Sequence, residues 1–107
     1  MRETLERIQA LVRSGDIRIS EHGYDELAED NITVQEILDG IADGRMVEDY
    51  PDFPKGPSVL VLQSDRESRA IHVVWGIPKG YLSPAVVVTA YRPDPEKWNE
   101  DFTERRT

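Results

Sequence analysis

The sequence contains no cysteine and no long apolar run. Without cysteine, the chain can form neither disulfide bonds nor a metal site with thiolate ligands. Its N-terminal residues follow an amphipathic pattern and lack the apolar core of a signal peptide, and no stretch reaches the roughly 20 apolar residues that span a bilayer. We therefore expect a protein without a membrane partner and, by default, a cytoplasmic location.

Basic residues are also in short supply. The chain has 13 lysines and arginines against 21 acidic residues, a formal net charge of −8. Affinity for nucleic acids depends largely on cations that neutralise phosphates, so this charge disfavours RNA as a partner. A local basic surface remains open, however, because residues 21–52 hold many of the acids while a set of bases lies in the second half: Arg66, Arg69, Lys79, Arg92, Lys97, Arg105 and Arg106.

The length of 107 residues, with 38% hydrophobic and 32% charged residues, is typical of one globular domain, and we assign residues 1–107 to a single domain. Helical periodicity marks the first half of the chain. A first helix is predicted up to Gly15, a residue suited to a C-terminal cap, from one apolar stripe formed by Leu5, Ile8, Leu11 and Val12.

Two further helices are predicted before residue 45. Ser20 is a suitable N-cap for a short helix that ends at Asn31, and its inner face would carry Tyr24, Leu27 and Ala28. Thr33 and Glu36 have the spacing of a capping box. They precede an apolar stripe that predicts a longer third helix: Val34, Ile37, Leu38 and Ile41.

The second half of the chain changes to apolar runs separated by turn residues. These runs predict four strands near residues 45–50, 58–64, 69–76 and 84–91. Short connections favour antiparallel pairing in sequence order. Asp94 and Pro95 then have the pattern of a helix start. The predicted fold is α+β: N-terminal helices packed on a four-stranded antiparallel meander sheet, with a short C-terminal helix.

Four segments of the sequence form a recognisable series: Ile19-Ser20-Glu21-His22, Val47-Glu48-Asp49-Tyr50, Ile71-His72-Val73-Val74, and VTAYRPDPEKW over residues 88–98. Over roughly residues 17–102, their order and spacing resemble the bacterial family known as domain of unknown function 4258. That family is in turn distantly similar in layout to RelE-type and BrnT-type toxins. The resemblance implies a toxin-like fold, a toxin–antitoxin setting, a protein partner and cleavage of messenger RNA.

One helix departs from the family pattern. After the serine, many family members carry a segment that resembles His-Ala-x-Glu-Arg-Met-x-Glu-Arg. This chain has Glu26 and Asp30 at the two arginine positions of that pattern. If those arginines bind phosphate in relatives, this chain has reversed the local charge. The acids therefore weaken the prediction of a ribonuclease.

The two histidines are the first candidate catalytic residues. His22 lies in the first turn of a predicted helix, where a neutral imidazole is favoured, and could serve as a general base, as a ligand or as a structural bridge. His72 lies in the middle of a predicted strand, where a structural role is also open. Together they would supply an acid and a base for phosphodiester cleavage, so we expect both to border one pocket.

Tyr91 and Arg92 end the last predicted strand and are further catalytic candidates. In a ribonuclease of this layout, the arginine could stabilise the phosphorane and the phenol could transfer a proton or stack on a base. The same residues also fit a purely structural turn. Lys79 and Tyr81, in a glycine-flanked loop, are candidate binding residues or parts of an exposed hairpin connection.

Three functions remain open at this point. The favoured one is a binding or regulatory module with little or no catalysis, because the acids after His22 would repel phosphate. The second is a metal-independent endoribonuclease that uses His22 and His72. The third is a self-associating domain whose main surface is an apolar edge or face of the sheet. As partners, a second protein and a homo-oligomer both remain open. We expect no cofactor, and no metal site because the histidines lack the spacing of metal ligands.

Overall fold

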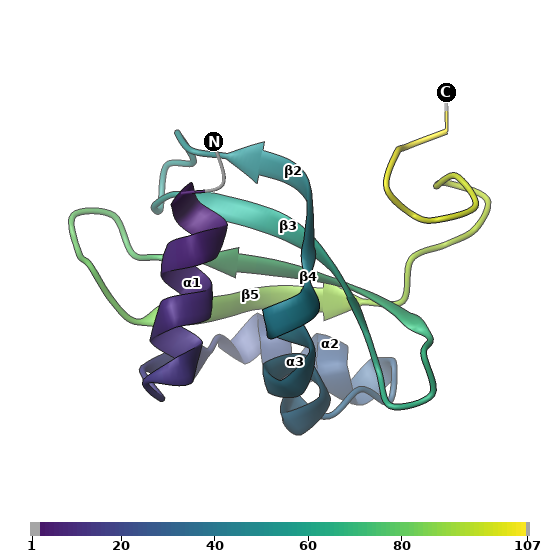
Figure 1. Cartoon of the computed structure of the whole chain (residues 1–107), viewed down its shortest axis with the longest axis horizontal. Helices are drawn as coiled ribbons and strands as arrows, with labels where there is room; N and C mark the ends of the chain where they lie inside the picture. Colours follow the sequence, from purple (N-terminus) through teal and green to yellow (C-terminus); the bar gives the residue numbers. More distant parts are fainter. Residues whose placement is uncertain (1–2, 107) are drawn as a thin grey trace.

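A computed structural model describes residues 3–106 of the chain (Figure 1). Three helices lead into the sheet: α1 (Glu3–Arg13), α2 (Glu21–Glu29) and α3 (Val34–Gly40), the last continued by a 3-10 turn (Ile41–Asp43). The strands are β1 (Ile17–Ile19), β2 (Arg45–Tyr50), β3 (Ser58–Ser64), β4 (Ala70–Gly76) and β5 (Ala85–Tyr91). The predicted α+β class is therefore confirmed, and all three helices precede strands β2 to β5.

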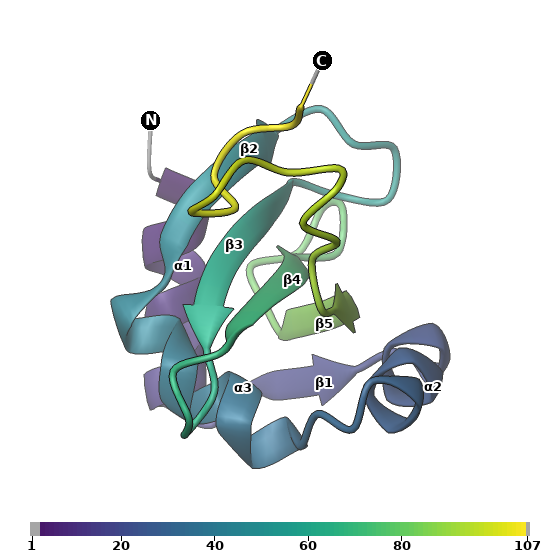
Figure 2. The ribbon, with the colours of Figure 1, turned by 90° about the vertical axis from the view of Figure 1, so that its right-hand side faces the viewer.

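The sheet has five strands in the order β1-β5-β4-β3-β2. Strands β2 to β5 form the predicted antiparallel meander. The prediction of a wholly antiparallel, four-stranded sheet is wrong, because β1 adds a fifth strand parallel to β5, with Ile17 opposite Ala85 (Figure 2). Backbone bonds extend this pairing at both ends: Ala85 N–H donates to the Asp16 carbonyl and Ser20 N–H to the Val87 carbonyl, both at 3.0 Å.

Helix α1 ends as predicted. Gly15 has a φ of 78°, a left-handed conformation that glycine adopts without steric cost. Gly15 N–H donates to the Val12 carbonyl and Asp16 N–H to the Leu11 carbonyl, at 3.0 and 2.9 Å. This pair of bonds is a Schellman motif, and it turns the chain directly from α1 into β1.

Helix α2 begins at the predicted N-cap, but the side of the helix that is buried differs from the predicted one. The Ser20 hydroxyl accepts a bond from Gly23 N–H at 2.9 Å, which confirms the N-cap. The predicted inner face is wrong at two positions: Leu27 is buried, but Tyr24 and Ala28 are exposed. Gly23 explains the rotation, because a Cβ built there would lie only 2.9 Å from the Val87 carbonyl oxygen. The helix backbone therefore rests directly on β5.

Helix α3 has the predicted capping box between Thr33 and Glu36. It spans 7 residues against 9 in α2, so the prediction that it is the longer helix is wrong. Its apolar stripe nevertheless continues into the 3-10 turn, and both Ile37 and Ile41 are buried as predicted. The Gln63 amide donates to the Ile37 carbonyl at 2.9 Å, which satisfies a carbonyl in the last turn of the helix.

Helices α1 and α3 pack on one face of the sheet, and α1 lies across it in Figure 1, whereas α2 lies beyond the end of β1, beside β5 (Figure 2). Buried side chains of α1, α3 and strands β3 to β5 form the core between them, among them Ile8, Ile37, Val61, Val73 and Trp75. The buried Trp75 Nε1–H donates to the Gln63 Oε1 at 2.8 Å, so this ring has a hydrogen-bond partner. Within residues 3–106, no helix is long and apolar enough to cross a membrane.

The second face of the sheet is partly covered by the C-terminal strap, which we define as residues 94–106. The predicted C-terminal helix is wrong: within the strap the chain forms only turns and an isolated bridge between Trp98 and Arg105. Asn99 N–H bonds the Glu104 carbonyl and Arg106 N–H the Lys97 carbonyl, both at 2.8 Å, so the strap folds back on itself. The Asn99 side chain also accepts from Thr103 N–H at 2.9 Å and so competes with helix formation.

Candidate functional site

Polar side chains gather beneath the strap on the second face of the sheet. His72 on β4 and Tyr91 on β5 are directly opposite each other, and directly paired residues point to the same face. Glu48 and Tyr50 reach this face from β2, because they are paired with Leu60 and Ser58. The strap adds Trp98 and Arg105. These six residues are called the strap site below.

His72 has no exposed surface, and both of its ring nitrogens have partners. Its Nε2 lies 2.8 Å from the Phe102 carbonyl oxygen, and its Nδ1 lies 3.3 Å from the Tyr91 hydroxyl. A carbonyl can only accept, so the network assigns the proton to Nε2 and leaves Nδ1 to accept from Tyr91. The ring also packs edge-to-face against Trp98, with centroids 4.4 Å apart. The strap therefore seals His72 from solvent.

Burial sets the ionisation of this pair. Desolvation lowers the pKa of His72, and the hydrogen bond to the Phe102 carbonyl opposes this only in part. Desolvation likewise raises the pKa of the Tyr91 hydroxyl. Both groups are consequently neutral near pH 7, and neither is poised to exchange protons with a substrate.

The charged members of the strap site satisfy one another. Arg105 holds both oxygens of Glu48, with Nε–Oε2 at 2.9 Å and an Nη2–Oε1 bond at 3.1 Å. The hydrogen bond from Arg105 lowers the pKa of Glu48, and the Tyr50 hydroxyl also donates to Glu48. Burial and Glu48 raise the pKa of Tyr50 to about 12. The guanidinium carbon of Arg105 lies 4.7 Å from the Trp98 ring centroid, a cation–π contact.

An open pocket of about 300 Å³ borders the strap site, and we call it the strap pocket. Its walls carry three bases and one acid: Arg92, Lys97 and Arg105 against Asp94, with Tyr91 and Trp98 between them. Within residues 3–106, Lys97 forms no salt bridge, whereas the two arginines have carboxylate partners. In a chain of net charge −8, the strap pocket is locally basic.

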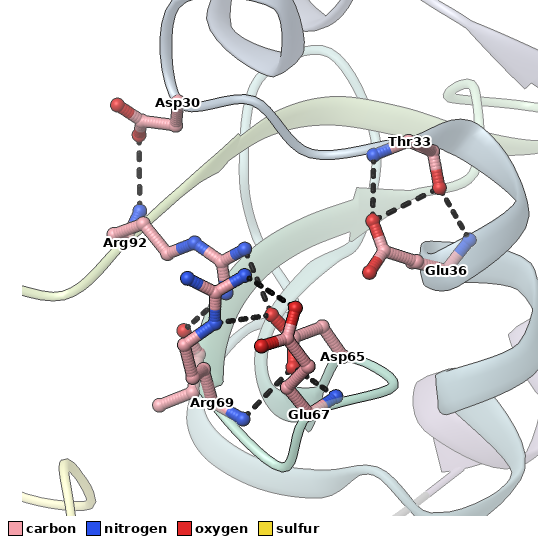
Figure 3. A network of polar contacts seen from close by, with 8 residues as sticks. Asp30, Thr33, Glu36, Asp65, Glu67, Arg69 and Arg92 are labelled. Atoms are coloured by element: carbon pink, nitrogen blue, oxygen red, sulfur yellow. Dashed lines mark hydrogen bonds and ion pairs between the residues drawn. The ribbon is translucent and has the colours of Figure 1, made fainter.

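Arg92 has a structural role in addition to its place in the pocket wall (Figure 3). Its Nη2 lies 2.9 Å from the buried Asp65 Oδ2, and its Nη1 donates to the Ala70 carbonyl at 3.2 Å. Burial would raise the pKa of Asp65, but backbone bonds from Arg69 and Glu67 and the bond from Arg92 outweigh it and lower the value to about 2. The predicted phosphate-binding arginine is therefore held by an internal carboxylate.

His22 lies apart from the strap site. Its side chain is 67% exposed on the first turn of α2, and its Nε2 is 3.5 Å from Glu26 Oε1 in the same helix. Because His72 has no exposed surface, the two histidines cannot border one open pocket. The prediction of a shared pocket is wrong: the sequence placed each histidine on the expected element but not the strap that covers His72.

Lys79 and Tyr81 lie in the loop between β4 and β5, at the opposite end of the molecule from the strap (Figure 1). Lys79 N–H donates to the Lys55 carbonyl at 2.9 Å, and the Tyr81 ring is 70% exposed. These two candidate binding residues do not contribute to the strap site. Of the predicted residues, the structure brings together only His72, Tyr91 and Arg92.

Four members of the strap site were not predicted: Glu48, Tyr50, Trp98 and Arg105. Glu48 and Tyr50 carried a signal, because polar residues two apart on a strand share one face. Trp98 lies where the sequence predicted a C-terminal helix, whereas the structure has turns and a bridge there. For Arg105 the sequence held no signal, since its position depends on an irregular segment. Within the described chain, no group of three or more histidine or acidic residues is placed to hold a metal ion.

Comparison with known proteins gives one match. A family model described as "Domain of unknown function (DUF4258)" matches residues 19–92. This span includes four members of the strap site, Glu48, Tyr50, His72 and Tyr91, and it ends before Trp98 and Arg105. No curated protein and no solved structure matches the chain.

Proposed function

This chain belongs to the DUF4258 family, a domain of unknown function, and we propose that it is a binding module whose strap pocket takes a small phosphate-bearing ligand without cleaving it. The burial of His72 carries this proposal. A general acid or base must come within hydrogen-bond reach of the proton that it transfers. His72 has no exposed surface, and the Phe102 carbonyl and the Tyr91 hydroxyl occupy its two nitrogens.

The walls of the strap pocket favour an anion. Lys97 is exposed and free of salt bridges within residues 3–106, so it can bind a phosphate without breaking an internal pair. Arg105 is well exposed and presents donors beyond those that hold Glu48. The half-buried Tyr91 adds an aromatic side chain next to these cations, and the buried Trp98 ring supports Arg105 from beneath. A phosphate on an aromatic or heterocyclic group, such as a nucleotide, matches this combination of charge and ring.

Binding can be tested by titrating the protein with inorganic phosphate and with a nucleoside monophosphate. The indole signal of Trp98 in ¹⁵N-resolved NMR spectra should shift on addition of the nucleotide, and Lys97→Gln should weaken binding at least about fivefold. Lys79→Gln is the matched control, since it removes an exposed lysine at the other end of the sheet. Equal binding by both variants, or none by the wild type, would refute the proposed ligand class.

A metal-independent ribonuclease is the second candidate function. It is supported by the strap site, which collects a carboxylate, an imidazole, two phenols and a guanidinium, a set able to perform acid–base catalysis once exposed. This function requires the strap to lift. The Trp98→Ala variant, which lacks the ring that covers His72, should then cleave RNA. The double variant Trp98→Ala/His72→Gln should not.

The cleavage assay also tests the binding proposal directly. We expect the wild-type protein to leave RNA intact in the presence of chelator. His22→Ala should behave identically, because His22 lies outside the strap site. RNA cleavage by the wild type that disappears in His72→Gln would replace the binding module with the ribonuclease.

A further inference from the structure

A predominantly apolar hollow of about 240 Å³ lies on the second face of the sheet, at the end opposite the strap. Phe53 and Lys55 line it from the loop between β2 and β3, Ile77 from the loop after β4, and Val86 and Val88 from β5. Both loops lie at that end of the sheet in Figure 1. We call this cavity the end hollow. None of the described residues that line it belongs to the strap site or lines the strap pocket.

The floor of the end hollow depends on a glycine. Gly76 on β4 is paired with Ser58 on one side and with Val86 on the other, so the three positions share one face of the sheet. A Cβ built on Gly76 would lie 3.0 Å from the Ser58 hydroxyl oxygen and 3.5 Å from a Val88 methyl carbon. Ser58 and Val88 both line the hollow. The floor is therefore open at this point because Gly76 has no side chain.

The rim of the end hollow is held by backbone hydrogen bonds between its two loops. Ile77 N–H donates to the Pro57 carbonyl at 3.0 Å, and Lys79 N–H donates to the Lys55 carbonyl at 2.9 Å. A Cβ built on Gly56 would overlap the Ile77 carbonyl oxygen, so the loops pack backbone against backbone. The hollow is consequently formed before a ligand arrives, and little loss of loop freedom opposes binding.

The polar side chains of the end hollow determine which ligand group it can bind. The Ser20 hydroxyl donates to the Val88 carbonyl at 2.8 Å, and the Ser58 hydroxyl donates to the Gly56 carbonyl at 3.1 Å. Both hydroxyl protons are thus used inside the protein. Lys55 is exposed, is the only charged residue among the described residues of the walls, and forms no salt bridge within residues 3–106. Its ammonium group is therefore the side-chain donor in these walls that remains free for a ligand.

We propose that the end hollow binds a small monocarboxylate with an apolar body, such as a medium-chain fatty acid or an aryl carboxylate. The body covers Val86, Val88 and the Phe53 ring, and the carboxylate faces Lys55. A cavity of about 240 Å³ holds a body of about eight carbons, because a group of that size occupies roughly 30 Å³. A single lysine matches one negative charge, and the apolar walls disfavour the doubly charged phosphate proposed for the strap pocket.

The test is an NMR titration of the full chain with octanoate and with 2-naphthoate, followed through the methyl signals of Val86 and Val88. Both acids should shift these signals, with a dissociation constant on the order of 0.1–1 mM for such small ligands. The tighter of the two identifies the preferred body, alkyl or aryl. Acetate, which has the charge without the body, should leave the signals in place. 1-Octanol, which has the body without the charge, should bind at least about threefold more weakly than octanoate.

Two exposed positions test the charge and the apolar wall separately. Lys55→Gln should weaken octanoate binding about three- to fivefold, the effect of losing one exposed charge pair, and should leave 1-octanol binding unchanged. Lys79→Gln is the matched control, because it removes an exposed lysine of the neighbouring loop that does not line the hollow. Phe53→Ala should weaken octanoate and 1-octanol alike, by at least about threefold, since both bury their body against the ring.

Two results would overturn the proposal: no methyl shift with either acid at concentrations up to about 5 mM, or equal octanoate binding by Lys55→Gln and the wild type. Lys97→Gln, which weakens nucleotide binding in the strap pocket, should leave octanoate binding unchanged. The two ligand proposals therefore fail or hold independently of each other.

Discussion

Arg92 connects parts of the molecule that are distant in the sequence. Its guanidinium binds Asp65 in the turn between β3 and β4, and its backbone N–H donates to the Asp30 carboxylate at 3.0 Å (Figure 3). Asp30 is one of the two acids that, in the sequence analysis, weakened the prediction of a ribonuclease. Its local role is thus to fix the end of β5 against the end of α2. The Asp30 carboxylate, which weakened the ribonuclease prediction, therefore has a structural role.

His72 should make the stability of the protein depend on pH. Its folded pKa lies below the ordinary value of 6.5, so the unfolded chain binds a proton more readily than the folded one. Stability should therefore be complete above pH 6.5 and fall as the pH drops below it, by up to about 1.4 kcal/mol per pH unit until the folded pKa is reached.

Urea unfolding at pH 7.5 and pH 5.5 measures this dependence. The wild type should lose more free energy of unfolding between the two values than His72→Gln does. Asp65 does not interfere in this window, because its folded pKa of about 2 and its ordinary value of 3.8 both lie lower. Equal losses in the two proteins would contradict the assignment of a buried neutral imidazole.

Helix α2 shows where apolar periodicity alone leads to a wrong face. The sequence places Tyr24 and Ala28 on the same side as Leu27, yet the structure buries Gly23 with Leu27 instead. A glycine contributes no apolar side chain to a periodic stripe. It does permit close approach of backbone to backbone, and here that approach determines which side of the helix meets β5.

Gly23→Ala should destabilise the protein by about 1–3 kcal/mol, the usual cost of forcing atoms into a packed contact. The added Cβ would lie 2.9 Å from the Val87 carbonyl oxygen, so α2 or β5 must move. Asp25→Ala introduces the same residue on the exposed side of the same helix and should change stability by less than about 0.5 kcal/mol. A stabilising effect of Gly23→Ala in thermal or denaturant unfolding would show that α2 does not rest on β5.

The predictability of the other elements follows from their length and local signals. Strands β2 to β5 were predicted within one residue, because apolar runs bounded by turn residues are strong signals. Strand β1 has three residues, too few for a pattern, and its pairing with β5 depends on how α1 returns the chain to the sheet. The strap contains a good helix start at Asp94, but the hydrogen bond that the Asn99 side chain accepts from Thr103 N–H favours another conformation.

The strap site could be predicted only in part, because it depends on the register of the whole sheet. A register shift between Met46 and Glu48 in β2, and another between Val74 and Trp75 in β4, set which side chains share a face. Neither irregularity has a clear mark in the sequence. His72 and Tyr91 could be predicted as residues on neighbouring strands, whereas their enclosure by the strap could not.

At the scale of the whole molecule, the second face of the sheet is divided. The strap covers one end, where it buries His72, and the other end carries a predominantly apolar hollow of about 240 Å³ whose walls include Phe53, Ile77 and Val88. Trp98 is the main anchor of the strap: it is buried, packs on His72 and lies beneath Arg105. The division between a covered and an uncovered half therefore rests largely on one aromatic ring.

Trp98→Ala should loosen the strap while the sheet and helices stay folded, because the core between helices and sheet does not include Trp98. His72 would then gain access to water, and since burial is the main cause of its lowered pKa, that pKa should rise toward 6.5. An NMR titration of the imidazole protons measures the change. Phe53→Ala, which removes an aromatic ring at the uncovered end, should leave the His72 titration unchanged. If Trp98→Ala also left the His72 titration unchanged, the strap would not be what keeps His72 from solvent. The binding proposal and the ribonuclease alternative both depend on that cover, so both would lose their structural basis.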